Sequence, residues 1–169
     1  MSITGVNEAI AMLNGLTDVR KINKGLYKLA QYGVEQARSN LQEFSFYNSP
    51  NGLIDSIAKE AVSPYEVAVN ADGGYATFVE YGTGIRGQNA PHPEVPMNWV
   101  YDSNNHGESG WWYPSETQPP EGQPQRFDAE KNIWYAWTKG LESHPFMYKT
   151  AQELKEIAAE TIESELVRK

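Results

Sequence analysis

The sequence predicts an α+β fold: a long N-terminal helix and a C-terminal helix packed on a small antiparallel sheet, with a long proline-rich loop insertion. Apolar residues recur at three-to-four spacing over residues 17–41 and 145–167, which is typical of amphipathic helices. Short alternating segments rich in β-branched and aromatic residues occur near 65–70 and 132–137, which is typical of strands. Helices and hairpins in one chain of this length favour a single α+β domain over residues 1–169.

The first long helix is expected over residues 17–41, after a short helix over residues 4–15. Gly25 and Gly33 each lower helix stability, by about 1 kcal/mol relative to alanine. Their small size suits close packing against another element. The apolar stripe of the long helix comprises Val19, Ile22, Leu26, Leu29, Ala30, Gly33, Ala37 and Leu41.

Two hairpins are expected between the helices. Residues 51–57 form a short helix or tight turn, and residues 59–62 then pair with strand 65–70. Further on, residues 110–113 form a strand whose antiparallel partner is 132–137.

The last helix is expected over residues 145–167. Pro145 suits the first turn of a helix, where its missing N–H costs nothing. The glutamates Glu153, Glu156, Glu160 and Glu163 are expected to face water. The apolar stripe comprises Met147, Ala151, Leu154, Ala158 and Ile162, with Ile157 widening it.

Residues 86–130 differ in composition from the rest of the chain. They hold seven of the ten prolines, and seven acidic side chains against two basic ones. Proline, glycine, asparagine and serine at this density indicate a long loop inserted in the domain. The net charge of −5 in this stretch disfavours binding to nucleic-acid phosphates.

The overall composition narrows the class of protein. The chain has 169 residues, 40% hydrophobic residues, a net charge of −8 and no cysteine. Thiol chemistry, disulfides and cysteine-based zinc sites are therefore excluded. No apolar run approaches the length of a membrane helix, and the N-terminus lacks the pattern of a signal peptide, so we expect synthesis in the cytosol and no membrane partner.

The most tightly specified motif is Tyr75–Gly84, which reads YATFVEYGTG. We expect a short helix that stops at a turn, with positive φ explaining Gly82 and Gly84. Glu80, Tyr81 and Thr83 complete this structural turn. A phosphate-cradling loop is the alternative, but the motif lacks the following lysine, and no helix is expected to start after it.

The sequence offers few catalytic or metal-binding candidates. His92, His106 and His144 are far apart and have no metal-ligand spacing, so solvated or capping histidines are expected. Glu80 with Asp72 would be a carboxylate pair for glycoside hydrolysis. The favoured alternative is that Glu80 accepts hydrogen bonds from a neighbouring turn or pairs with a basic residue. We therefore expect no catalytic residue, metal or cofactor.

All five tryptophans lie between residues 99 and 137. Flat rings of this kind stack on carbohydrates or nucleobases. They also pack in cores and dominate protein–protein interfaces, and a role at an interface or in the packing of a hairpin is favoured in an acidic, proline-rich stretch. The residues predicted to meet a subunit or another partner are Trp99, Trp111, Trp112, Trp134, Trp137, Pro145 and Phe146.

Four motifs in order resemble a family of tailed-phage virion proteins. Tyr75-Ala76 followed by Val79–Gly84 is similar to the signature of the tail-component, tail-completion or head–tail joining proteins, typified by gene product ten of a lambda-like coliphage. Residues 51–57 resemble the family's Gly-x-Leu-x-x-Ser-Ile segment. Residues 134–140 resemble its aromatic-Thr-Lys/Arg-Gly stretch, and 145–147 resemble its Pro-Phe-Leu/Met helix start. The likeness spans roughly residues 20–165, and the long 86–130 region departs from it.

This resemblance implies a non-enzymatic virion protein, made in the host bacterial cytoplasm and located in the neck or tail. Its partners would be connector or head-completion proteins, a tail terminator or the tail tube. Copies would form a homo-oligomeric ring, possibly from free monomers, and DNA would pass through its acidic lumen without specific binding. Two alternatives stay open: a small carbohydrate-binding or carbohydrate-active domain that uses the tryptophans and Glu80, and a cell-internal adaptor.

Overall fold

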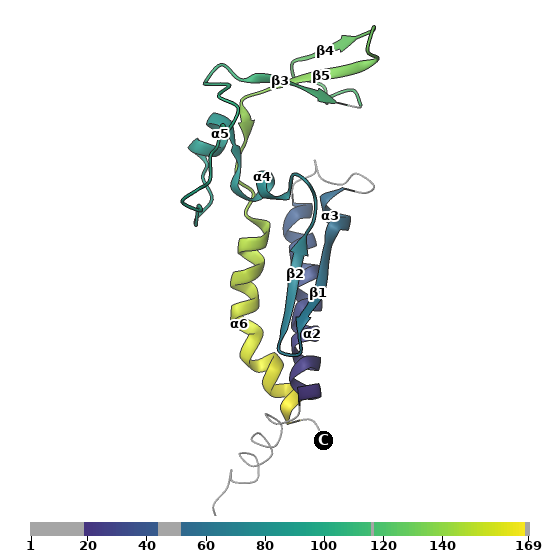
Figure 1. The fold of residues 1–169 in the computed structure, drawn as a ribbon, viewed down its shortest axis with the longest axis vertical. Helices are drawn as coiled ribbons and strands as arrows, with labels where there is room; N and C mark the ends of the chain where they lie inside the picture. The colour runs from purple at the N-terminus through teal and green to yellow at the C-terminus, as the bar shows by residue number, and fades with distance from the viewer. Residues whose placement is uncertain (1–18, 44–51, 116, 168–169) are drawn as a thin grey trace, which may run out of the picture. The chain divides into compact units, whose positions relative to one another are not determined.

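The computed structural model describes residues 19–43, 52–115 and 117–167, and the predicted helix over 4–15 lies outside them. The described residues fall into two compact units (Figure 1). We call residues 19–76 with 146–167 the terminal unit and residues 77–145 the central unit. The helices and small antiparallel sheets of the protein confirm the predicted α+β class, with the strands divided between two sheets.

The predicted helices and hairpins are present, together with α5, β4 and β6, which were not predicted. The helices are α2 (Val19–Gln42), α3 (Leu53–Ser56), α4 (Ala76–Tyr81), α5 (Gly84–Asn89) and α6 (Phe146–Leu166). The strands are β1 (Ile57–Ser63), β2 (Glu66–Ala71), β3 (Trp111–Ser115), β4 (Gln125–Asp128), β5 (Ile133–Thr138) and β6 (Gly140–Leu141).

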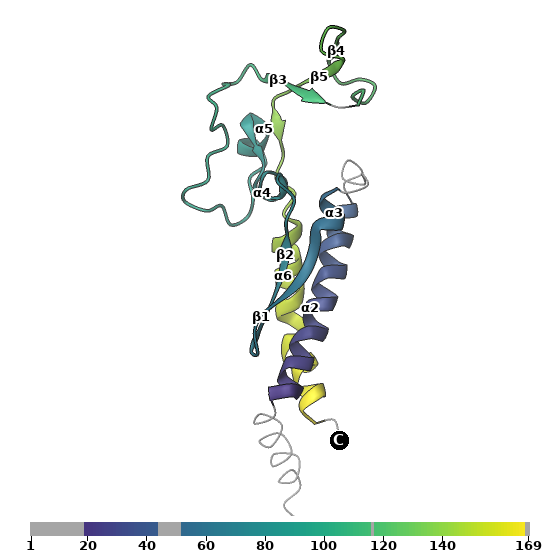
Figure 2. The ribbon, with the colours of Figure 1, turned by 45° about the vertical axis from the view of Figure 1, so that its right-hand side comes forward.

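In the terminal unit, α2 and α6 pack side by side and run antiparallel (Figures 1 and 2). The early part of α2 meets the late part of α6: a Cβ placed on Gly25 would lie 3.4 Å from the Ile162 Cα. Further along, a Cβ on Gly33 would lie 3.0 Å from Leu154 Cδ1. The predicted close packing at both glycines is confirmed.

Replacing Gly33 with leucine is expected to destabilise the terminal unit by about 1–3 kcal/mol, because the added side chain overpacks a filled contact. Leu154 and Val69 crowd the position from two elements, since Val69 Cγ2 would lie 3.1 Å from the new Cβ. Urea unfolding followed by far-UV circular dichroism measures the loss. A variant as stable as the wild type would show that α2 and α6 can separate at this level without cost.

The β1–β2 hairpin lies along α2 (Figure 2). Its antiparallel register places Lys59 opposite Val69, as the predicted hairpin requires, with an irregularity between Ala61 and Ser63. The Arg38 guanidinium donates a hydrogen bond to the carbonyl of Ile57 at 2.9 Å, tying the first strand to the helix. The core of this unit contains Ala30, Val34, Ala37, Leu41, Leu53, Ile57 and Phe146.

Glu165 is a buried carboxylate that the sequence analysis did not identify. It is 3% exposed, on the side of α6 that faces α2. The Lys24 and Lys28 ammonium groups, at 3.0 and 3.3 Å, compensate its charge. By contrast Glu156, Glu160 and Glu163 are exposed, as predicted. The same prediction was wrong for Glu153, which is half-buried, with its Oε2 atom buried.

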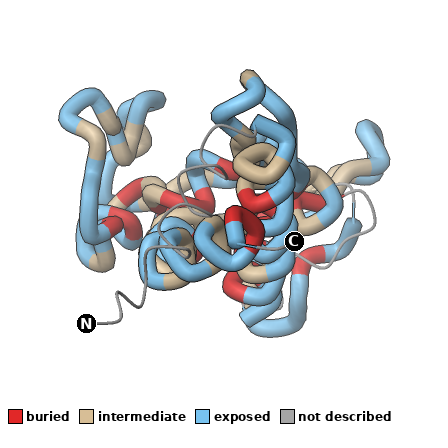
Figure 3. Tube along the Cα trace, turned by 90° about the horizontal axis from the view of Figure 1, so that it is seen from below, coloured by how far each residue is buried: buried red, intermediate tan, exposed pale blue. Residues whose placement is uncertain are grey.

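The central unit contains a three-stranded antiparallel sheet in the order β3-β5-β4. The predicted pairing of 110–113 with 132–137 is confirmed, since Trp112 lies opposite Trp137. β4 was not predicted. The region 86–130 is therefore a loop only in part: it contains most of α5 together with β3 and β4, while residues 90–110 form no helix or strand. Buried positions occur as short stretches between exposed ones (Figure 3).

Candidate functional site

The Tyr75–Gly84 motif forms a helix, a stop and a backbone crossing. Gly82 closes α4 by donating its N–H to the Phe78 carbonyl at 2.9 Å. Gly82 and Gly84 have φ of 79° and 60°, so the predicted positive-φ turn is present. The backbone then pairs with β6 through antiparallel bridges from Thr83 to Leu141 and from Gly84 to Gly140, and we call this contact the crossing.

Side chains are excluded at this crossing. A Cβ on Gly82 would lie 2.8 Å from both the Leu141 carbonyl oxygen and the Ser143 nitrogen. The expectation that no helix starts after the motif was wrong, because α5 begins at Gly84. Gly84 donates its N–H to the Tyr101 carbonyl at 2.6 Å, which holds the start of α5 to the following loop.

Glu80 and His92 form a buried pair. They are 7% and 5% exposed, and His92 Nε2 lies 3.1 Å from Glu80 Oε1. The Glu94 N–H donates to His92 Nδ1 at 2.9 Å, so Nδ1 is an acceptor and Nε2 carries the proton that is donated to the carboxylate. His92 is therefore not the solvated histidine that was expected. Pro91 and Pro93 flank it, and the chain folds back so that the ring reaches the end of α4.

The last carbonyls of α4 are bonded by a second segment. The Ser143 hydroxyl donates to the Glu80 carbonyl at 2.6 Å, and the His144 N–H donates to the Val79 carbonyl at 2.8 Å. Ser143 also donates its N–H to Ala90 at 3.2 Å. Carbonyls at a helix end need such partners when they are buried. The helix end, the start of the 90–110 loop and residues 143–144 thus form one hydrogen-bonded junction.

An aromatic cluster surrounds this junction. The Tyr81 ring centroid lies 4.7 Å from that of His92 and 5.2 Å from that of Trp99. Trp99 also contacts Phe78 at 5.9 Å and Tyr101 at 6.5 Å. Among the predicted interface tryptophans, Trp99 is thus engaged inside its own unit, where it holds the loop to α4.

The four other tryptophans lie on the two faces of the three-stranded sheet. Directly opposed residues share a face, and successive residues alternate between faces. The face that we call the Arg126 face comprises Trp112, Pro114, Arg126, Asp128, Ile133, Tyr135 and Trp137. The opposite face comprises Trp111, Tyr113, Gln125, Phe127 and Trp134. The tryptophans therefore do not line one groove, as a carbohydrate site built from all of them would require.

The Arg126 side chain contacts two aromatic rings of its own face. Its guanidinium carbon is 4.8 Å from the Trp112 centroid and 4.9 Å from the Tyr135 centroid. No ion pair joins Arg126 to any carboxylate among the residues that the structure describes. Arg86, the other basic residue of the 86–130 region, instead pairs with Glu142 at 3.8 Å. Arg126 is thus a fixed, exposed cation in an acidic stretch of chain.

His106 belongs to a tight turn in the long loop. Its ring stacks on Trp111 with centroids 4.4 Å apart. Asp102 accepts the backbone N–H groups of His106 at 2.9 Å and of Gly107 at 2.8 Å. These bonds, and the His106 ring at 3.0 Å, lower the pKa of Asp102 below its ordinary value of 3.8.

The turn at 102–107 is expected to open in acid. The folded-state pKa of Asp102 is depressed, so its contribution is present above the unfolded-state pKa and is lost as the pH falls through the folded value, below 3.8. An acid titration followed by the amide resonances of His106 and Gly107 measures this loss. Asp102→Asn is the control: those resonances should then be independent of pH in this range, and an unchanged titration would contradict the assignment.

The remaining candidates do not assemble a catalytic or metal site. Among residues 19–43, 52–115 and 117–167, no three histidine or acidic side chains are grouped to hold a metal ion. Asp72 is exposed, and Glu80 is already bonded to His92. Phe146 is 1% exposed, so this predicted interface residue belongs to the core and is not available to a partner, while Pro145 and His144 are half-buried.

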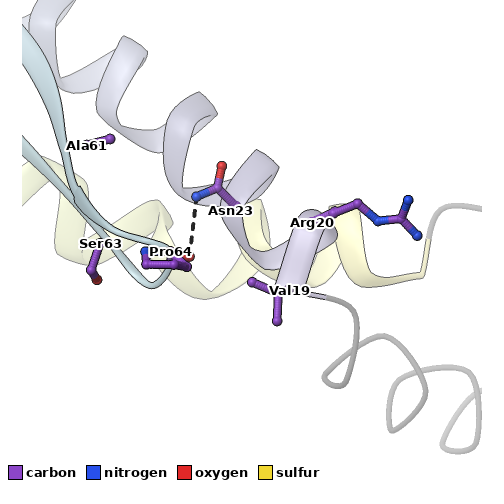
Figure 4. A pocket seen from close by; sticks show the side chains of 6 residues that line it. All are labelled: Val19, Arg20, Asn23, Ala61, Ser63 and Pro64. Carbon is purple, nitrogen blue, oxygen red and sulfur yellow. Dashed lines mark hydrogen bonds between the residues drawn. The ribbon is translucent and has the colours of Figure 1, made fainter.

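Described residues of the terminal unit line two surface hollows. One, of about 450 Å³, lies beside the tip of the β1–β2 hairpin, where Asn23 donates a hydrogen bond to the Pro64 carbonyl at 3.3 Å (Figure 4). The other is apolar and is lined by α2, β2 and α6. Neither gathers a set of convergent polar groups that would bind a small molecule.

No helix within the described part of the chain is long and apolar enough to cross a membrane. No protein-family model, curated protein or solved structure matches the chain.

Proposed function

We propose that this protein is a non-enzymatic structural component of a tailed-phage virion, located in the neck or at the tail-completion ring. It would act through protein–protein contacts with connector, terminator or tail-tube proteins and with further copies of itself. DNA would pass the acidic ring without being held, since repulsion opposes contact with its phosphates.

One observation carries this proposal: within each unit, motifs of the resemblance that are distant in sequence contact one another. Tyr75 opens the central motif, and its hydroxyl accepts the N–H of Leu53 at 3.1 Å, in the 51–57 motif. Gly84 closes the central motif and bridges Gly140, at the end of the 134–140 motif. Motif residues that hold the fold together fit a protein that works by assembling.

The 51–57 motif also has a structural explanation. Leu53 and Ile57 are fully buried, and the Ser56 hydroxyl donates to the Leu53 carbonyl at 2.7 Å. Phe146, in the last motif, is buried as well. We infer that these motifs specify the scaffold and that exposed surfaces outside them select the partner.

The test is the composition of purified phage particles. We expect the protein in particles at a few copies per virion, and we expect its loss by gene disruption to leave heads and tails that do not join. Mass spectrometry and negative-stain electron microscopy measure both. The major capsid and tail-tube proteins of the same preparation serve as internal controls. Particles that lack the protein and assemble normally without it would refute the proposal.

A further inference from the structure

We propose that the Arg126 face of one copy binds the exposed glutamates of α6 on a second copy. The contact would be the repeating subunit contact of the ring, so its biological role rests on the proposed function. In this contact, the guanidinium held over the Trp112 and Tyr135 rings receives a carboxylate row comprising Glu156, Glu160 and Glu163.

The Arg126 side chain is already held in place before any partner binds. Rings at 4.8 and 4.9 Å restrict the guanidinium plane, and its edge keeps N–H donors that suit a carboxylate. Because the side chain is already held, less rotamer freedom is lost on binding. Trp112 is 41% exposed, so the surrounding ring surface is available for burial.

The Arg126 face carries more than one positive charge. Lys139 lies over Trp137, with its ammonium 5.9 Å from the ring centroid, which adds a second cation. Asp128 is an acid of the same face, and its charge is offset by the Lys131 ammonium at 3.9 Å, while its Oδ1 accepts the backbone N–H groups of Glu130 and Lys131, both at 3.1 Å. A locally cationic, aromatic face on a chain of net charge −8 calls for an acidic partner.

The exposed glutamates of α6 form a row of carboxylates along one side of the helix. Glu156, Glu160 and Glu163 recur at intervals of about one turn, on the side away from the stripe that packs on α2. All three are exposed, and none has an ion pair among the described residues. Lys149, on the same side of the helix, is already near Glu43 at 3.5 Å. Like charges at this spacing repel, so a partner cation would relieve them.

A second copy fits better than nucleic acid. The two surfaces differ and lie on different units, so contact between copies is heterologous, and repetition closes into a ring when the rotation permits. DNA phosphates would also suit an arginine, but residues 86–130 carry seven acids against two basic side chains. Nucleic-acid binding is therefore an opposing outcome of the test.

The first experiment reverses charge on each surface separately. Arg126→Glu, and the triple variant Glu156→Lys, Glu160→Lys and Glu163→Lys, should each weaken self-association at least about tenfold in sedimentation. An equal mixture of the two variants should recover it, because the intact row of one meets Arg126 of the other and the reversed charges also match. Arg86→Glu is the control: it reverses charge at another exposed arginine of the same unit and should leave association unchanged.

Failure of the mixture to recover, or equal weakening by Arg86→Glu, would overturn the proposal. Recovery depends on contact between chains, so a contact within one chain would not give it. Near-ultraviolet circular dichroism of each variant confirms that its aromatic packing is retained.

The second experiment detects weak contacts directly. The chain has no cysteine, so Ala159→Cys, at an exposed position of α6, carries a single spin label beside the row without removing any of its members. Labelled protein mixed with isotope-labelled wild type at ~1 mM should broaden amide resonances of β3, β4 and β5, because contacts with a Kd near 1 mM are populated there. The Arg126→Glu variant should lose this broadening. No broadening in the wild type, or shifts of the same amides with duplex DNA alone, would overturn the inference.

The two proposals fail separately. Protein found in particles without broadening would refute only this contact. Broadening in a protein that particles lack would refute the virion role and leave the contact standing.

Discussion

Replacing Gly82 with alanine is expected to destabilise the central unit by about 3–5 kcal/mol, enough to unfold many small units. Two costs add. A residue with a Cβ is strained at φ of 79°, and the new Cβ would lie 2.8 Å from the backbone of Leu141 and Ser143. A backbone atom cannot move aside as the end of a side chain can, so the crossing of the motif with β6 must shift. Fluorescence-monitored urea unfolding measures the loss, because all five tryptophans lie in the central unit.

Gly107 provides a matched control. Its φ is 70°, close to that of Gly82, but a Cβ there would meet no atom within 4 Å. Gly107→Ala should therefore show the conformational cost alone, about 1 kcal/mol. The difference between the two variants isolates the steric part. Equal effects would mean that the crossing at Gly82 is not tight, and our account of the turn would be wrong.

The elements that the sequence predicted best are those with strong local patterns. The stripes of α2 and α6 extend over several turns, and packing follows the pattern because burying one face is the main stabilising contribution to such helices. The glycines in α2 also indicated close packing. Gly33 faces Leu154, a residue of the predicted stripe on the other helix.

The parts that were missed depend on contacts between distant residues. β4 has four residues, one of them strongly apolar, so it shows no alternation. It exists because β5 offers a free edge and because a turn returns the chain, with Asp128 accepting two N–H groups and Asn132 at φ of 50°. Asparagine and aspartate at these positions are a recognisable turn signal. That signal would have identified the hairpin.

The burial of His92 could not be predicted from its neighbours in the sequence, and that of Glu165 could be predicted only from its position on a helix stripe. His92 lies between prolines in a polar stretch, and its partner Glu80 is in another element. Glu165 does carry a weak signal, because it follows Ile162 on the stripe that faces α2. A glutamate at a core position calls for a cation on the facing helix, and Lys24 and Lys28 supply it.

The second large effect is expected at Glu80. Glu80→Ala should destabilise the central unit by about 2–3 kcal/mol, because it removes the acceptor of a buried hydrogen bond and leaves the His92 Nε2–H facing a void. Glu80→Gln is the matched control. Its side-chain oxygen can still accept from Nε2 at nearly the same place, so most of the stability should remain. Both are measured by tryptophan fluorescence in urea at pH 7.

A double-mutant cycle with His92→Ala separates the pair from its surroundings. If Glu80 and His92 stabilise the fold through each other, the double variant should lose less than the sum of the single variants, with a coupling of about 1–2 kcal/mol. The Glu80 carbonyl, which accepts from Ser143, is retained in all variants, so that bond cancels. Strict additivity would show that each residue acts through other neighbours. A Gln variant as unstable as the Ala variant would show that the charge of the carboxylate, rather than its hydrogen bond to His92, holds the end of α4.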